Sequence, residues 1–81
     1  MKIVYFAWVR EQIGCDEEPA PEGASTVAEL VEMLRSKGGG HAAALADESR
    51  LRFALDQQMV KADAGLDGAS ELAIFPPVTG G

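Results

Sequence analysis

The chain has 81 residues, a formal net charge of −6, 47% hydrophobic residues and a single cysteine, Cys15. This length predicts one domain over residues 1–81. The lone cysteine excludes an intramolecular disulfide and favours a reducing, cytoplasmic location. The negative charge argues against nucleic acid as a partner, and no apolar run reaches the roughly 18 residues of a membrane-spanning helix, so no membrane is expected.

The N-terminal stretch KIVYF is β-branched and aromatic, which predicts a strand over residues 2–6. Apolar residues occupy both odd and even positions of this stretch, so both faces of the strand are apolar. We therefore expect a central strand that is covered on both faces. AWVREQIG follows, with Val9 and Ile13 four residues apart and Gly14 where a helix would stop, which predicts one or two helical turns. Phe6 and Trp8 are expected in the core, with an exposed binding anchor as the alternative.

The segment CDEEPAPEG predicts an edge strand or a loop, because Pro19 and Pro21 cannot donate hydrogen bonds to a strand ladder. Its acidic residues are interpreted as a solvated surface run. They should raise the pKa of the Cys15 thiol, which also follows a helix C-terminus, so Cys15 is not expected to be a catalytic nucleophile.

The clearest helix begins at Thr26, where TVAE has capping-box spacing and Glu29 is expected to cap Thr26 in return. Val27, Leu30, Val31 and Leu34 then recur at helical spacing, which indicates one face packed on a core. GGGHAAAL follows, which predicts a flexible break and then a short helix. His41 is interpreted as a solvated loop residue, since no second ligand stands at metal-binding spacing and no metal site is expected.

The C-terminal third predicts three strands, over residues 51–55, 58–60 and 71–75, with turns at 56–57 and 66–70. In the first of these, Leu51, Phe53 and Leu55 should face the core, and Arg52 and Ala54 the solvent. One long helix against a small mixed sheet, with the first and last strands adjacent at its centre, gives an α+β fold of the β-grasp type. Met59 and Phe75 lie on strands whose outer face no predicted helix covers, so they are candidate contact residues.

The sequence ends in FPPVTGG. Pro76 and Pro77 should keep the tail from folding back onto the sheet. Extended, residues 76–81 would reach roughly 20 Å at about 3.3–3.6 Å per residue. Gly80 and Gly81 lack a Cβ and can enter a narrow channel, and they would deliver one functional group, the Gly81 carboxylate, which accepts a nucleophile once it is activated as an acyl adenylate.

FPPVTGG, preceded by LDGASELAI, resembles the C-terminus of the sulfur-carrier subunits of molybdopterin synthases, and FAWVREQIG resembles their opening strand and short helix. The resemblance implies a β-grasp fold and no bound cofactor. It implies that an ATP-using activating enzyme adenylates Gly81 and that a thiocarboxylate follows. The tail, Pro76, Pro77, Val78, Thr79, Gly80 and Gly81, would then enter the large synthase subunit, usually in a heterotetramer, and donate sulfur to a pterin. Phe75, Met59 and Phe6 match the family's apolar partner contacts.

Three alternatives remain at this point. The chain could be a thiamine-type sulfur carrier, a ubiquitin-related modifier joined to lysine through Gly81, or a binding module whose tail is incidental. The sequence also departs from the family's usual pattern, with Asp56 where Asn is common and Gly68-Ala69 where Gly-Asp is common. These departures concern turns and leave the tail motif unchanged.

Overall fold

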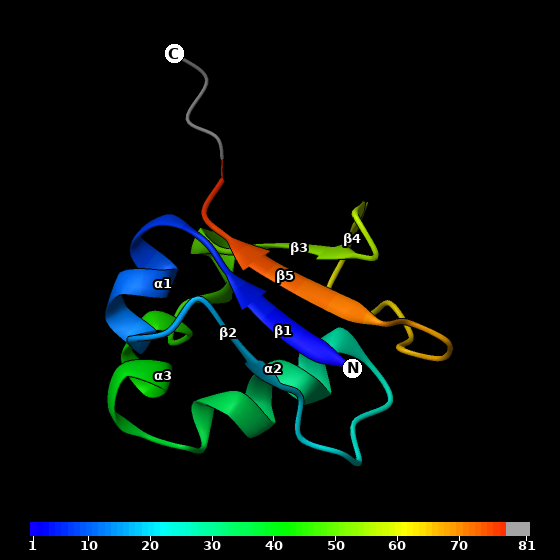
Figure 1. The fold of residues 1–81 in the computed structure, drawn as a ribbon, viewed down its shortest axis with the longest axis horizontal. Helices are drawn as coiled ribbons and strands as arrows, with labels where there is room; N and C mark the ends of the chain where they lie inside the picture. Colours follow the sequence, from blue (N-terminus) through cyan, green and yellow to red (C-terminus); the bar gives the residue numbers. More distant parts are fainter. Residues whose placement is uncertain (78–81) are drawn as a thin grey trace.

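Within residues 1–77, the part of the chain that the computed structural model describes, five strands form one mixed sheet (Figure 1). The strand order is β2-β1-β5-β3-β4. The strands are β1 (Lys2–Tyr5), β2 (Glu17–Pro19), β3 (Arg52–Leu55), β4 (Gln58–Val60) and β5 (Glu71–Phe75). The helices are α1 (Ala7–Ile13), α2 (Val27–Arg35) and α3 (Gly39–Ala44), with a 3-10 turn, η1 (Glu48–Arg50).

The first and last strands are neighbours at the centre of the sheet, as predicted. β1 and β5 run parallel with Tyr5 opposite Ile74, while β3 pairs antiparallel with β5. The proline-bearing segment forms the edge strand β2, antiparallel to β1. Because β1 and β5 run parallel, α1 begins at the same end of these two strands as the C-terminal tail (Figure 1).

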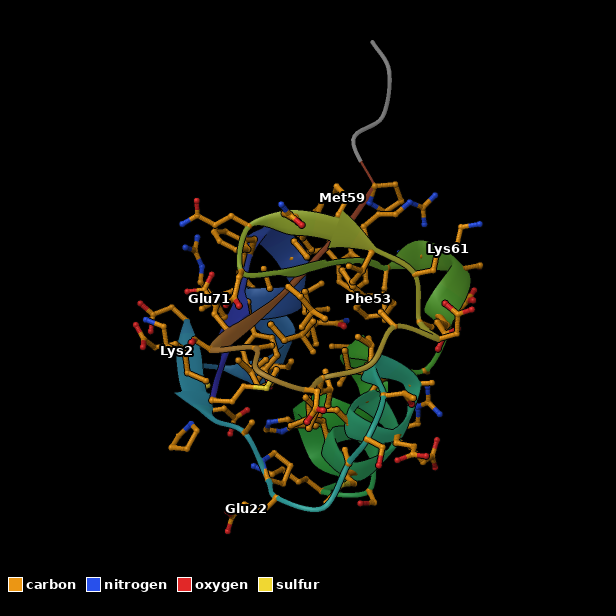
Figure 2. All side chains as sticks on the ribbon, turned by 90° about the vertical axis from the view of Figure 1, so that its right-hand side faces the viewer. Lys2, Glu22, Phe53, Met59, Lys61 and Glu71 are labelled. Carbon is orange, nitrogen blue, oxygen red and sulfur yellow. The ribbon has the colours of Figure 1, made fainter. Side chains whose placement is uncertain are left out.

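The core lies between one face of the sheet and the helices. Ile3, Tyr5, Phe53, Leu72 and Ile74 point from the sheet into it, and they meet the predicted stripe of α2 (Val27, Leu30, Val31 and Leu34). Figure 2 shows Phe53 directed into the body and Met59 on the opposite side. The expectation that β1 is covered on both faces is wrong, since Val4 is only half-buried and Lys2 is exposed. The alternate residues of β1 face away from the helices.

The start of α2 differs from the predicted capping box in one bond. Thr26 is the N-cap and its Oγ1 accepts a hydrogen bond from the Glu29 backbone N–H at 3.2 Å. The Glu29 carboxylate accepts instead from the backbone N–H of Ser25, at 2.7 Å. The first bond satisfies a donor that the first helical turn leaves free, and the second binds the residue before the cap, so the helix begins where the sequence predicts.

The glycine run before His41 is an ordered corner, and the predicted flexible break is wrong. Gly38 and Gly39 have positive φ angles of 78° and 54°, which glycine adopts without steric cost. Gly40 lies within α3 against α1, where an added Cβ would stand 2.1 Å from the backbone oxygen of Gln12. The run therefore turns the chain and lets two helices approach closely.

The turn between β3 and β4 occurs where it was predicted. Asp56 and Gln57 both have positive φ, 47° and 72°, as in a tight hairpin turn. The Asp56 carboxylate also accepts hydrogen bonds from the backbone N–H groups of Ser70 and Glu71, each at 3.0 Å. Asp56 thus links the hairpin to the first residue of β5.

Candidate functional site

An apolar row crosses the open face of the sheet, the face opposite the core. Met59 of β4 lies opposite Ala54 of β3, Ala54 opposite Ala73 of β5, and Ala73 opposite Val4 of β1. Met59 is 64% exposed, whereas Ala54 and Ala73 are 8% and 7% exposed. Ala54 therefore points away from the core, as predicted, but its side chain is buried and not exposed to solvent. The row combines a protruding methionine with small side chains.

A second row lies nearer to the tail. Phe75, the last residue of β5, is half-buried and pairs with Arg52. Its ring meets that of Phe6 edge to face, with centroids 6.4 Å apart. Phe6 is 46% exposed, so the expectation of core packing is wrong for this residue. It continues β1 in extended conformation at the N-cap of α1, which places its side chain on the open face.

The tail begins beside this aromatic pair. The strand ends at Phe75, as predicted, and the half-buried Pro76 and Pro77 follow outside regular structure. The predicted tail residues Val78, Thr79, Gly80 and Gly81 lie outside the described residues. Among the predicted contact residues, the structure brings Phe6 and Phe75 together. Met59 shares their face but stands two strands away from β5.

Trp8 contacts both the hydrophobic core and the guanidinium group of Arg50. It is half-buried and packs against the core cluster, as expected. The guanidinium carbon of Arg50 lies 4.8 Å from the centroid of its ring, a cation–π contact. Sequence reasoning missed this pair because 42 positions, from 8 to 50, separate the two residues in the chain.

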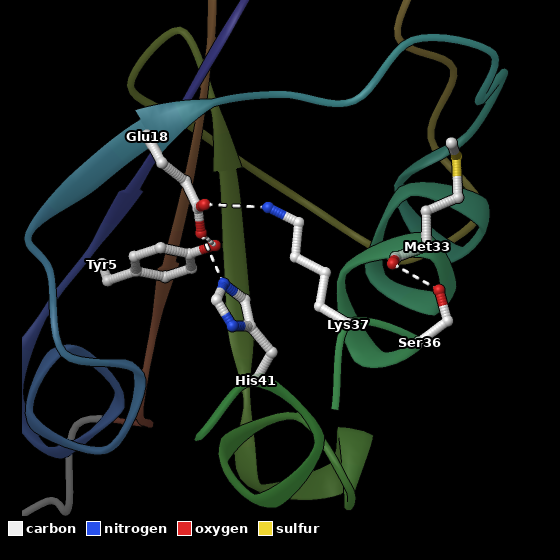
Figure 3. A network of polar contacts seen from close by, with 6 residues as sticks. All are labelled: Tyr5, Glu18, Met33, Ser36, Lys37 and His41. Atoms are coloured by element: carbon white, nitrogen blue, oxygen red, sulfur yellow. Dashed lines mark hydrogen bonds and ion pairs between the residues drawn. The ribbon is translucent and has the colours of Figure 1, made fainter. Parts of the chain in front are cut away.

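A polar cluster surrounds Glu18 of the edge strand β2, between the sheet and α3 (Figure 3). One carboxylate oxygen of Glu18 lies 2.6 Å from both the Tyr5 hydroxyl, which donates to it, and His41 Nε2. The other accepts from Lys37 Nζ at 3.0 Å. The Glu18 and His41 side chains are 16% and 17% exposed. The predictions of a solvated His41 and a wholly solvated acidic run are thus wrong.

Burial by itself would raise the pKa of Glu18. The hydrogen bonds from Tyr5, His41 and Lys37 outweigh burial and lower that pKa to about 2. In the same cluster, burial and the Glu18 hydrogen bond raise the pKa of Tyr5, so the phenol keeps its proton. Burial, followed by the charges of Glu18 and Asp16, raises the pKa of Cys15. The predicted direction for the Cys15 thiol is confirmed.

We expect Glu18 to make the fold acid-sensitive. Its pKa is lower in the folded chain than the ordinary value of 4.5. Its contribution to stability is therefore complete above about pH 4.5 and is lost as the pH falls toward 2. Glu18→Gln should lower the free energy of unfolding at pH 6 by about 2–3 kcal/mol, and the difference from wild type should shrink as the pH falls.

Urea unfolding between pH 6 and pH 2.5 measures this effect. The matched control is Glu17→Gln, because Glu17 is exposed and its carboxylate is 3.5 Å from Lys2 Nζ. A surface pair of that kind contributes at most about 1 kcal/mol. A Glu18→Gln variant that runs parallel to wild type over the whole pH range would contradict this assignment.

Within residues 1–77, no three His, Cys, Asp or Glu side chains are grouped so that they could hold a metal ion. None of the helices in that part of the chain has the length and apolar character needed to cross a bilayer.

Comparison with known proteins gives relatives over the full length of the chain. The model of the ThiS family matches residues 3–81. The chain is 37% identical to the molybdopterin synthase sulfur carrier subunit of Escherichia coli K12 and 33% identical to that of Haemophilus influenzae. Each alignment covers 100% of this chain and 99% of the relative.

Solved structures share the architecture. A protein of Pyrococcus furiosus, provisionally named molybdopterin converting factor, subunit 1, is 31% identical and superposes with a TM-score of 0.71, with 95% of each chain covered. SAMP1 from Haloferax volcanii superposes with a TM-score of 0.74, and the match covers 100% of this chain and 98% of SAMP1. Because the two sequences are only 23% identical, this similarity shows the fold alone. The fold is the predicted ubiquitin-like β-grasp.

Proposed function

Because this chain belongs to the ThiS family, among the molybdopterin synthase sulfur carrier subunits, we propose that the Gly81 carboxylate is its reacting group. The chain is a sulfur carrier of molybdopterin synthesis. The observation that carries the proposal is its full-length kinship with carriers, 37% and 33% identical. The position of Phe75, Pro76 and Pro77 at the C-terminal end of β5 supports it, because the tail continues directly from a central strand of the sheet.

The proposed chemistry uses two displacements at the tail. A Gly81 carboxylate oxygen attacks the α-phosphorus of ATP on an adenylating enzyme, and pyrophosphate leaves. A sulfur nucleophile such as sulfide then attacks the acyl carbon, AMP leaves, and a thiocarboxylate remains. Its sulfur would be transferred to the pterin in the large synthase subunit. This chain would bind no cofactor of its own, because ATP is consumed by the activating enzyme.

Each tail residue has a separate part in this proposal. Pro76 and Pro77 hold φ near −65° and direct the chain away from the sheet. Val78 and Thr79 extend it, and Gly80 and Gly81 enter a channel too narrow for a side chain. If extended, the segment 76–81 would reach roughly 20 Å from Phe75, so the body could dock outside while the reacting carbon lies within the partner.

The open face of the sheet is the proposed docking surface for both enzymes. Phe6 and Phe75 form an aromatic pair at the base of the tail, and Met59 protrudes from the same face. Exposed aromatic residues and methionine are enriched at the cores of protein interfaces. The proposed partners are the large synthase subunit, in a heterotetramer of two small and two large subunits, and the activating enzyme, both in the cytoplasm.

Intact mass spectrometry tests the proposal. Incubation with the activating enzyme, ATP and sulfide should increase the mass by about 16 Da, the difference between an oxygen and a sulfur atom. Omission of ATP is the control and should leave the mass unchanged. An unchanged mass with an enzyme that is active on another carrier would contradict the proposal, and adducts with lysine-bearing proteins would instead indicate a modifier.

A further inference from the structure

Two arginines near the base of the tail form no ion pair within residues 1–77. Arg52 lies opposite Phe75 in the sheet, and Arg50 precedes it by two positions, with the buried Leu51 between them. Within residues 1–77, ion pairs with carboxylates are formed by Lys2, Arg35, Lys37 and His41. Neither Arg50 nor Arg52 forms an ion pair within that range, in a chain with 13 acidic residues.

Both guanidinium groups are exposed and held in place. Arg50 lies 4.8 Å from the ring centroid of Trp8. Arg52 Nη1 donates to the backbone oxygens of Leu51, at 2.8 Å, and Ser49, at 3.3 Å. The nearby Asp47 carboxylate accepts from the Ser49 backbone N–H and hydroxyl, at 3.0 and 2.6 Å. Side chains that are already ordered lose less entropy when they bind.

We propose that Arg50 and Arg52 form a carboxylate-binding pair that docks an acidic segment of the large synthase subunit beside the tail. This inference rests on the proposed function above. A partner that takes in the tail must bring its surface around the tail entrance against the residues at the base of the tail. Guanidinium groups match carboxylates in a bidentate geometry.

The distance from Arg52 to the end of the tail indicates which anion the two arginines bind. A pterin substrate that meets Gly81 would lie up to roughly 20 Å from Phe75, and Arg52 is opposite Phe75. The arginines would therefore contact the protein surface at the entrance of the channel and leave the substrate to other residues. The large subunit is the chosen partner because the relatives are named as subunits of the synthase.

Binding of the purified large subunit to surface-immobilised carrier tests the pair. Arg50→Gln combined with Arg52→Gln should weaken binding about tenfold or more. Arg35→Glu changes the net charge equally on α2, across the core from the open face, and should stay within about twofold of wild type. Equal binding by wild type and the double variant would overturn the inference alone. No binding by wild type would contradict the proposed function, and this inference with it.

A crosslinking experiment keeps the test decisive if the double variant folds poorly. Arg52→Lys preserves the charge and introduces a primary amine, which a carbodiimide joins only to a carboxylate in direct contact. The complex should then contain a crosslink from position 52 to an Asp or Glu of the large subunit, identified by peptide mass spectrometry. Crosslinks at Lys2 or Lys61 with none at position 52 would overturn the inference.

Discussion

A carrier extended by a single alanine after Gly81 should fold as wild type does and lose sulfur transfer completely. The added residue turns the Gly81 carboxylate into a peptide carbonyl and places the new carboxylate about 3.3–3.6 Å further along the tail. It also adds a Cβ where the proposal requires none. The measurement is intact mass after incubation with activating enzyme, ATP and sulfide, together with pterin conversion by the reconstituted synthase.

The matched control adds the same alanine at the other end of the chain, before the exposed Met1. This control should gain the thiocarboxylate and support conversion as wild type does. Urea unfolding should show equal stability for both extended chains, because neither addition touches the core. Sulfur transfer by the C-terminally extended chain would show that the reaction takes place elsewhere.

Gly40→Ala should destabilise the fold by about 3 kcal/mol or more, against the usual effect of this substitution. In the interior of an ordinary helix, alanine is more favourable than glycine by about 1 kcal/mol. Here the new Cβ would lie 2.1 Å from the backbone oxygen of Gln12 and 3.2 Å from the Cα of Ile13. These are backbone atoms of α1, so relief requires the two helices to separate. Urea unfolding at neutral pH measures the change.

Ala43→Gly is the control for helix propensity, because Ala43 is an exposed residue of the same helix. It should cost about 1 kcal/mol, clearly less than Gly40→Ala. Stability of Gly40→Ala equal to or above that of wild type would mean that α1 and α3 pack further apart than this 2.1 Å approach implies.

Features that depend on residues close together in the sequence were predictable. The stripe of α2 and its Thr26 cap, the turn at Asp56 and the end of the last strand at Phe75 each follow from short-range chemistry. The central pairing of β1 and β5 followed from their apolar composition together with the small number of ways to arrange such a sheet. These features locate the open face of the sheet and the base of the tail.

Features that depend on distant partners were not predictable from the sequence. His41 resembles a loop histidine because its partner, Glu18, is 23 positions away on an edge strand. Gly40 resembles part of a flexible run because its close contact belongs to α1. Phe6 has the composition of a core residue, and only its place in the register next to β5 exposes it. The Trp8–Arg50 contact likewise requires that the fold be known first.

The central position of the last strand has a consequence for biosynthesis. β5 lies between β1 and β3, so neither the N-terminal strand nor the β3–β4 hairpin has its main neighbour until residues 71–75 have left the ribosome. A nascent chain that stops earlier lacks the strand that joins β1 to β3 beneath α2, and stable folding should begin only after β5 has been synthesised. The proposed activating enzyme, if it recognises the folded body, would therefore not engage chains whose synthesis halts before that strand.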